Sequence, residues 1–173
     1  MIELRRHIRD IPDFPKPGIV FRDITPLLAE RGAFHAMVDR FVERYRGRAD
    51  VVLGIESRGF LIGAAVAYGL GIGIALVRKP GKLPSQTYAA RYELEYGSDT
   101  LEIHHDAIGA GHRVLIVDDL LATGGTASAA VELVKRCGGE VIACAFVIEL
   151  AFLGGRRRLE GIEVFSLVDY ERA

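Results

Sequence analysis

Apolar side chains recur at helical spacing in residues 33–46. They fall at positions i, i+3, i+4 and i+7, which places them on one face of an α-helix, with charged residues opposite. The pattern predicts an amphipathic helix that packs on a core. Its apolar face consists of Phe34, Met37, Val38, Phe41, Val42 and Tyr45.

Continuous apolar runs make up most of the remaining pattern. Such runs, rich in Val, Ile, Leu and Ala, are typical of strands buried on both faces of a parallel sheet. Helical segments alternate with them, which indicates an α/β fold: a mostly parallel, twisted sheet flanked by helices on both faces. The expected strands are residues 51–55, 72–77, 113–117, 141–148 and 164–168, and the expected further helices are residues 60–68 and 126–137.

The longest apolar stretch, residues 59–77, is uncharged and has nearly the length of a membrane-spanning helix. It also contains Gly69 and Gly73 at the GxxxG spacing of paired membrane helices. However, Gly69, Gly71 and Gly73 lie together in its middle, where a helix of a soluble protein would end. A helix followed by a buried strand uses every feature of the stretch, so we favour that interpretation.

Composition and charge limit the kinds of partner. A chain of 173 residues that is 50% hydrophobic can bury one core, so we expect a single domain over residues 1–173. Its net charge of -1 provides no field that would hold nucleic acid or an anionic membrane. Cys137 and Cys144 match neither a redox pair nor a metal site, and no secretory signal is visible. We expect a cytoplasmic protein that binds small molecules.

Residues 78–99 form a long polar connection between predicted strands. They include Pro80, Gly81, Pro84 and Gly97, which disfavour regular structure. Irregular segments of this length in a compact domain usually serve as functional lids or mobile loops. We therefore expect residues 78–99 to lack regular structure and to act as a flexible lid.

The strongest chemical signal follows the predicted strand at residues 113–117. The strand is expected to stop at Asp118 and Asp119, before a glycine-rich turn and a helix start. Glycines allow backbone N–H groups to converge on an anion, and the helix N-terminus adds a favourable dipole. The two carboxylates would repel a phosphate, so they suit ribose hydroxyl groups instead. The predicted 5-phosphate-binding residues are Ala122, Thr123, Gly124, Gly125 and Thr126.

Other interpretations of these glycine-rich segments fit less well. Acids that merely cap the helix would explain the turn but not two carboxylates at the end of the strand. A Walker A loop would need Gly five residues before Gly81, where the chain has Leu76. A dinucleotide-binding fingerprint would need its glycines between a strand and a helix, whereas Gly69, Gly71 and Gly73 precede a strand.

The segment VLIVDDLLATGGT, residues 114–126, resembles the phosphoribosyl pyrophosphate (PRPP) signature of the type I phosphoribosyltransferases, in the variant of the adenine-specific members. The resemblance covers nearly the whole chain in the family's order. It continues through DFPKPGIVFRDITPLL (13–28), GIESRGFLIG (54–63), RKPGKLP (78–84) and YELEYGSDTLEIHHDAI (92–108). It implies transfer of the phosphoribosyl group of PRPP to adenine, with Mg2+ carried by PRPP rather than by direct protein ligands.

The resemblance also implies a homodimer in which lid residues reach the partner's site, and it assigns the pyrophosphate-binding loop to residues 56–58. In the family this loop often contains a cis peptide bond, here near Glu56–Ser57, although many relatives have Asp where this chain has Glu56. Arg58 at a helix start favours an anionic partner, because a cation is slightly unfavourable there. The residues assigned to the pyrophosphate are Ser57, Arg58, Arg78, Lys79 and Lys82.

The catalytic carboxylate and the base site are likewise assigned by resemblance. Glu95 in the lid would accept the proton of the purine or hydrogen-bond to it, and Tyr96 would pack over the site. Residues 1–32 correspond to the family's N-terminal hood, where Phe21 would stack on adenine and the backbone at Val20 and Arg22 would contact its edge. From the residues alone, simple packing of this segment is an equal alternative.

Two further functions stay open: transfer to another purine base, and a PRPP-sensing regulator without catalysis. The hood and the LEYG segment disfavour the first, and the absence of a basic module or excess charge disfavours the second. His104 and His105 indicate metal only weakly, since adjacent strand positions face opposite sides. Residues 156–158 are expected to be a solvated basic turn.

Overall fold

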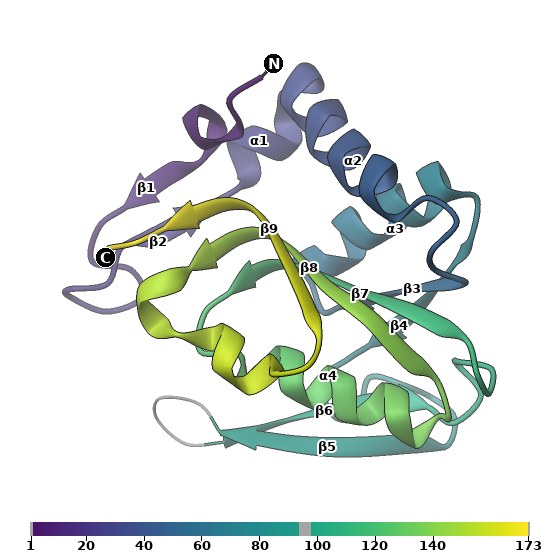
Figure 1. The fold of residues 1–173 in the computed structure, drawn as a ribbon. Coiled ribbons are helices and arrows are strands. Elements are labelled where there is room, and N and C mark those ends of the chain that lie inside the picture. Colours follow the sequence, from purple (N-terminus) through teal and green to yellow (C-terminus); the bar gives the residue numbers. More distant parts are fainter. Residues whose placement is uncertain (1, 94–97, 173) are drawn as a thin grey trace.

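The structure is a computed structural model that describes residues 2–93 and 98–172 (Figure 1). Its centre is a five-stranded parallel sheet in the order β4-β3-β7-β8-β9. The strands are β1 (Arg9–Ile11), β2 (Phe21–Asp23), β3 (Val51–Ile55), β4 (Gly73–Val77), β5 (Thr87–Glu93), β6 (Ser98–His104), β7 (Arg113–Leu121), β8 (Glu140–Leu150) and β9 (Glu163–Tyr170). The helices are α1 (Thr25–Ala29), α2 (Arg31–Tyr45), α3 (Arg58–Leu70) and α4 (Gly125–Arg136), with short 3-10 helices η1 (Leu4–His7), η2 (Ala151–Leu153) and η3 (Gly155–Leu159).

Helices α2 and α3 cover one face of the parallel sheet (Figure 1). Met37, Phe41 and Tyr45 of α2 are fully buried in the same core as Val52 of β3 and Leu115 of β7. These three belong to the face predicted from helical spacing, so the amphipathic helix is confirmed. It begins where the Glu30 side chain accepts a hydrogen bond from the Ala33 backbone N–H, as an N-cap does.

The opposite face is covered by α4 together with the antiparallel hairpin β5–β6 (Figure 1). Leu133 of α4, Leu101 and Ile103 of β6 and Ile116 of β7 are all fully buried in one core. The α/β architecture with a parallel sheet covered on both faces is therefore confirmed. One of its two covering layers contains strands that the sequence pattern did not predict.

The expectation that residues 78–99 lack regular structure is wrong. Thr87–Glu93 and Ser98–His104 form an antiparallel ladder in which Tyr92 lies opposite Asp99. Ala90 and Tyr92 are buried while their sequence neighbours are exposed, which is the alternation of a half-buried strand. Packing against α4 favours this hairpin over a loop, and Pro80, Gly81 and Pro84 all lie in the segment before it.

Strand β7 also differs from its prediction, because it continues to Leu121 instead of stopping at Asp118 and Asp119. Its pairing with β8 extends to the register Leu121–Glu149. Both aspartates are thus strand residues, at 9% and 8% exposed, rather than members of a turn. Backbone pairing with β8 on either side of Asp119, at Asp118 and Leu120, fixes their position more firmly than a loop would.

The uncharged stretch 59–77 divides into α3 and β4, as expected. The helix ends at Gly71, whose φ of 70° is the left-handed conformation of a glycine C-cap. Within the described residues, the structure has no helix that is long and apolar enough to span a membrane.

The N-terminal segment forms a small antiparallel pair, β1–β2, followed by α1. The pair lies beside the C-terminal end of β9 (Figure 1). Arg22 of β2 forms an ion pair with Asp10 of β1 at 2.5 Å, and its guanidinium lies 4.3 Å from the ring centroid of Tyr170 in β9. The predicted hood is therefore an ordered element fixed to the sheet.

Candidate active site

A cavity of about 320 Å³ opens at the carboxyl ends of β3 and β7. It is lined by residues 56–58 and 118–127, together with Lys79, Tyr92 and Leu101. The N-terminal ends of α3 and α4 meet there, so two helix starts point at one space. Open parallel sheets bind ligands at this edge, and helix starts favour anions.

The predicted phosphate loop, residues 122–126, lines this cavity over its whole length. Gly124 has a φ of 83° and precedes the first residue of α4. Only glycine adopts this conformation without strain, and it turns the backbone so that α4 begins at the cavity. The first amides of α4 have no partner within the helix, which suits them to phosphate oxygens.

Asp118 and Asp119 both line the cavity, but their carboxylates have different polar partners. Asp118 accepts a hydrogen bond from the Asp119 backbone N–H at 2.9 Å. Burial, followed by the neighbouring Asp119 carboxylate, raises the pKa of Asp118 well above its ordinary value. Asp119 instead forms an ion pair with the Arg58 guanidinium. Burial thus disfavours the charged form of Asp118, while Arg58 balances the charge of Asp119.

The loop between β3 and α3 brings Glu56, Ser57 and Arg58 to the same cavity. The Glu56–Ser57 peptide bond is cis, as the resemblance implied. Gly59 follows, and a side chain there would lie 2.8 Å from Asp118 Oδ1 and 2.9 Å from the Val117 carbonyl oxygen. This close approach brings the Arg58 loop directly against β7.

Of the three lid cations assigned to the pyrophosphate, only Lys79 lines the cavity. Its ammonium group donates to the Tyr92 hydroxyl at 3.0 Å and forms an ion pair with Asp99. Burial lowers the pKa of Lys79, but the contacts with Asp99 and Tyr92 outweigh it and the net shift is upward. Lys79 therefore carries a positive charge into the site at neutral pH.

Arg78 and Lys82 do not line the cavity. The Arg78 guanidinium donates to Glu56 at 3.1 Å and to the Lys82 carbonyl oxygen at 3.3 Å. The Lys79 backbone N–H, at 2.9 Å, and then Arg78 lower the pKa of Glu56. This ion pair joins the start of the hairpin segment to the loop after β3.

The three residues assigned to adenine lie outside the residues that line the cavity. The Phe21 ring packs edge-on against Phe14, with 5.3 Å between centroids, and lies 5.7 Å from the Arg58 guanidinium. Arg22 directs its side chain to Asp10 and Tyr170, which leaves its backbone as the part available for a ligand. Phe21 therefore lies next to the cavity, because it is close to Arg58, which lines it. Val20 and Arg22 are its neighbours in the chain.

Glu95 and Tyr96, assigned to catalysis and to packing over the site, lie outside the described residues.

Two contributions to the site were missed in the sequence. Tyr92 and Leu101 line the cavity from the hairpin, and the alternation of buried positions around Tyr92 is the signal that could have found them. Residues 156–158 are exposed, as expected, and Arg156 also forms a 2.6 Å ion pair with Glu149, a side chain only 5% exposed. No local pattern predicts that pair, because Arg156 reaches Glu149 only when the chain after β8 folds back toward the sheet.

The parallel sheet, the helix start with its glycine turn, the aspartate pair and the cations define an enzyme that acts on a sugar phosphate. Residues 26–166 match the model of the phosphoribosyl transferase domain. The chain is 60% identical over 171 residues to adenine phosphoribosyltransferase of Geobacter metallireducens, covering 98% of this chain and 100% of that protein. It is 58% identical over 173 residues to adenine phosphoribosyltransferase of Solibacter usitatus, covering 99% of this chain and 100% of that protein.

Solved structures with a similar fold are of enzymes with the same name. The crystal structure of adenine phosphoribosyltransferase from Thermoanaerobacter pseudethanolicus has a TM-score of 0.94 at 50% identity, covering 96% of this chain and 98% of that one. The Saccharomyces cerevisiae enzyme, complexed with an imino-altritol bisphosphate and adenine, has a TM-score of 0.89 at 44% identity, covering 95% and 96%. This chain belongs to the phosphoribosyl transferase family and, within it, to the adenine phosphoribosyltransferases.

Proposed function

We propose that the chain transfers the 5-phosphoribosyl group of PRPP to N9 of adenine, giving AMP and pyrophosphate in purine salvage. The bond between C1 of the ribose and the pyrophosphate oxygen breaks, the bond from C1 to N9 forms, and the N9 proton leaves. The observation that carries the proposal is the cavity where the phosphate loop, the aspartate pair and Arg58 meet.

Each part of PRPP would contact a different group of residues that line the cavity. The amides and threonine hydroxyls of residues 122–126 would bind the 5-phosphate, and Asp118 and Asp119 the ribose hydroxyls. Burial raises the pKa of Asp118, which disfavours a second negative charge beside the phosphates.

The pyrophosphate would lie against Ser57, Arg58 and Lys79, whose donors and positive charges stabilise the leaving group as charge develops on it. Arg78 and Lys82 would join them when the lid closes or when a partner subunit supplies them. Among the described residues, no group of three or more His, Cys, Asp or Glu side chains is placed to hold a metal. The donor set fits Mg2+ that arrives on the pyrophosphate and ribose hydroxyls, where it would neutralise part of the leaving group's charge.

For the base, we propose that Phe21 stacks on adenine while the backbone at Val20 and Arg22 contacts its edge. Glu95 would accept the N9 proton or hydrogen-bond to the ring. The segment 78–99 would close over the site as a lid and exclude water, which would otherwise attack the ribosyl cation-like centre. The fixed position of β2 against Tyr170 supports a preformed base site.

The proposal includes a homodimer in the cytoplasm. Leu61 and Tyr68 of α3 are 58% and 90% exposed, and Leu76 on the edge strand β4 is 39% exposed. Large apolar side chains gathered on one helix and an adjoining sheet edge suit a contact with a second copy. Size-exclusion chromatography with light scattering would measure the assembly.

Incubation of the purified protein with PRPP, Mg2+ and one purine at a time tests the reaction. We expect AMP from adenine, measured by chromatographic separation of nucleotides, and no nucleotide from guanine, hypoxanthine or xanthine. A nucleotide from another purine would reassign the base. Binding of PRPP without turnover on any base would point to a regulator instead.

A further inference from the structure

The phosphate loop rests on a second turn that the proposed reaction does not use. A side chain at Gly155 would collide with the Ala122 carbonyl oxygen and would lie 3.1 Å from the Gly124 backbone nitrogen. A side chain at Gly124 would collide in turn with the Gly155 carbonyl oxygen. Two backbone segments about 30 residues apart in the sequence are therefore in direct contact, with no side chain between them.

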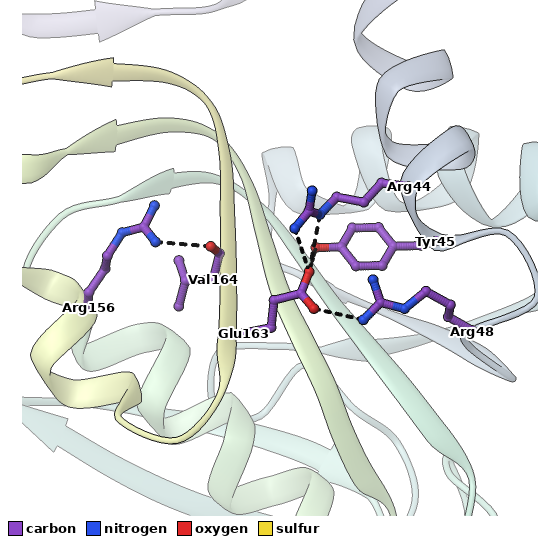
Figure 2. Close-up of polar contacts among 6 residues, drawn as sticks. All are labelled: Arg44, Tyr45, Arg48, Arg156, Glu163 and Val164. Atoms are coloured by element: carbon purple, nitrogen blue, oxygen red, sulfur yellow. Dashed lines mark hydrogen bonds and ion pairs between the residues drawn. The ribbon is translucent and has the colours of Figure 1, made fainter.

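An ion pair between the buried Glu149 carboxylate and the half-exposed Arg156 guanidinium holds this second turn in place. Arg156, next to Gly155 in η3, donates from Nε and Nη2 to the two carboxylate oxygens of Glu149 at 2.7 and 2.6 Å. Ser166 donates to the same carboxylate at 2.6 Å. Arg156 also donates to the Val164 carbonyl oxygen at 3.0 Å (Figure 2). The turn is thereby tied to both β8 and β9.

The hydrogen bonds to Glu149 favour its charged form. Burial would raise the pKa of Glu149, but the hydrogen bonds from Arg156 and Ser166 outweigh it, and the pKa lies below its ordinary value. In the sheet register Glu149 lies opposite Leu121, the last residue of β7 before the phosphate loop. A bidentate pair on a buried carboxylate orients its partners more strictly than an apolar contact does.

We propose that Glu149 and Arg156 are positioning residues for the 5-phosphate. They fix Gly155 against Ala122 and Gly124, so that the loop amides keep their direction into the cavity before the ligand arrives. This inference rests on the proposed function, because it takes residues 122–126 to bind the 5-phosphate. Neither side chain lines the cavity, so both act through the backbone of the loop.

The test replaces each part of the device in the full-length protein: Arg156→Met, Glu149→Gln and Gly155→Ala. We expect each variant to raise KM for PRPP and Kd for ribose 5-phosphate by about tenfold or more, because a small displacement of binding groups is costly. KM for adenine at saturating PRPP should change less than twofold. Steady-state kinetics and titration calorimetry measure these quantities, and the unfolding temperature is recorded for each variant.

Two matched controls separate positioning from general stability. Glu163→Gln removes another carboxylate that accepts from two arginines, Arg44 at 3.0 Å and Arg48 at 2.7 Å, and it does not line the cavity. Gly73→Ala adds a methyl group where no atom lies within 4 Å. Both controls should keep the wild-type KM for PRPP, whatever their unfolding temperatures.

Gly155→Ala keeps the ion pair and introduces only the backbone collision, so it reports on the contact even if the charge variants fail to fold. Wild-type KM for PRPP in that variant, or an equal rise in Glu163→Gln, would overturn the positioning role. If the wild-type protein itself neither binds ribose 5-phosphate nor makes AMP, the proposed function fails, and this inference fails with it.

Discussion

Asp118 and Asp119 show how adjacent residues of one type acquire different roles. Asp118 is turned toward its own chain and has a raised pKa, because it is desolvated and lies beside a second carboxylate. Asp119 pairs with Arg58, which links the ribose wall to the pyrophosphate loop. The Asp119 carboxylate is therefore balanced by a guanidinium that the pyrophosphate can also contact.

Asp119→Asn should raise KM for PRPP about tenfold or more, with a smaller effect on KM for adenine. A hydrogen bond to a charged group contributes about 1.5–3 kcal/mol, and about 1.4 kcal/mol corresponds to tenfold in affinity. Steady-state kinetics with PRPP varied at saturating adenine measures the change. Asp50→Asn is the matched control, because Asp50 pairs with Arg113 at 2.7 Å and does not line the cavity. Equal KM values in the two variants would refute the role of Asp119.

At the scale of elements, the hairpin β5–β6 combines two functions. Its inward side packs Leu101 and Ile103 into the core with α4, and Tyr92 and Lys79 meet in the cavity wall. The segment expected to be only a lid is therefore partly a fixed wall. Its alternation was readable at Tyr88, Ala90 and Tyr92, but the prolines and glycines before it suggested a loop throughout.

Glu95 lies between β5 and β6 in the chain, and the proposed role as proton acceptor gives a separable prediction. Glu95→Ala should lower kcat about a hundredfold or more, as the loss of a general base does. Kd for PRPP should stay close to wild type, because the carboxylate is assigned to the base and not to the sugar phosphate. Single-turnover kinetics and a PRPP titration test this. Glu93→Ala, at an exposed neighbouring side chain, serves as the control, and unchanged kcat in Glu95→Ala would exclude the role.

At the scale of the whole molecule, what could be predicted depended on whether a pattern of residue types along the chain indicates the contact. The phosphate loop and the aspartate pair fall within nine consecutive residues, so their chemistry was visible before folding. The contact of Lys79 with Tyr92 depends on packing of separate elements. Glu149 and Arg156 are only seven residues apart, but they meet because the chain after β8 folds back onto the sheet, which no residue pattern indicates. The strands and helices of the sheet could be predicted because apolar runs and helical spacing are local signals.

The contact between α2 and β9 illustrates such a nonlocal cluster and gives a pH prediction for the whole fold. Figure 2 shows Glu163 of β9 approached by Arg44, Tyr45 and Arg48 from one end of α2 and the residues that follow it. The Tyr45 hydroxyl donates to Glu163 at 3.4 Å. Burial, followed by the Glu163 charge, raises the pKa of Tyr45 to about 12.

An unfolded tyrosine has a pKa of about 10, so folding favours the protonated form of Tyr45. Its contribution to stability is complete below pH 10 and is lost as the pH rises toward 12, on the order of 1–3 kcal/mol. The free energy of unfolding, measured by urea titration at several pH values, should fall more steeply above pH 10 in wild type than in Tyr45→Phe. The phenylalanine variant has no hydroxyl to ionise, so the difference between the two curves isolates this residue. Parallel curves from pH 8 to 12 would mean that the hydroxyl ionises in the folded protein as freely as in the unfolded chain.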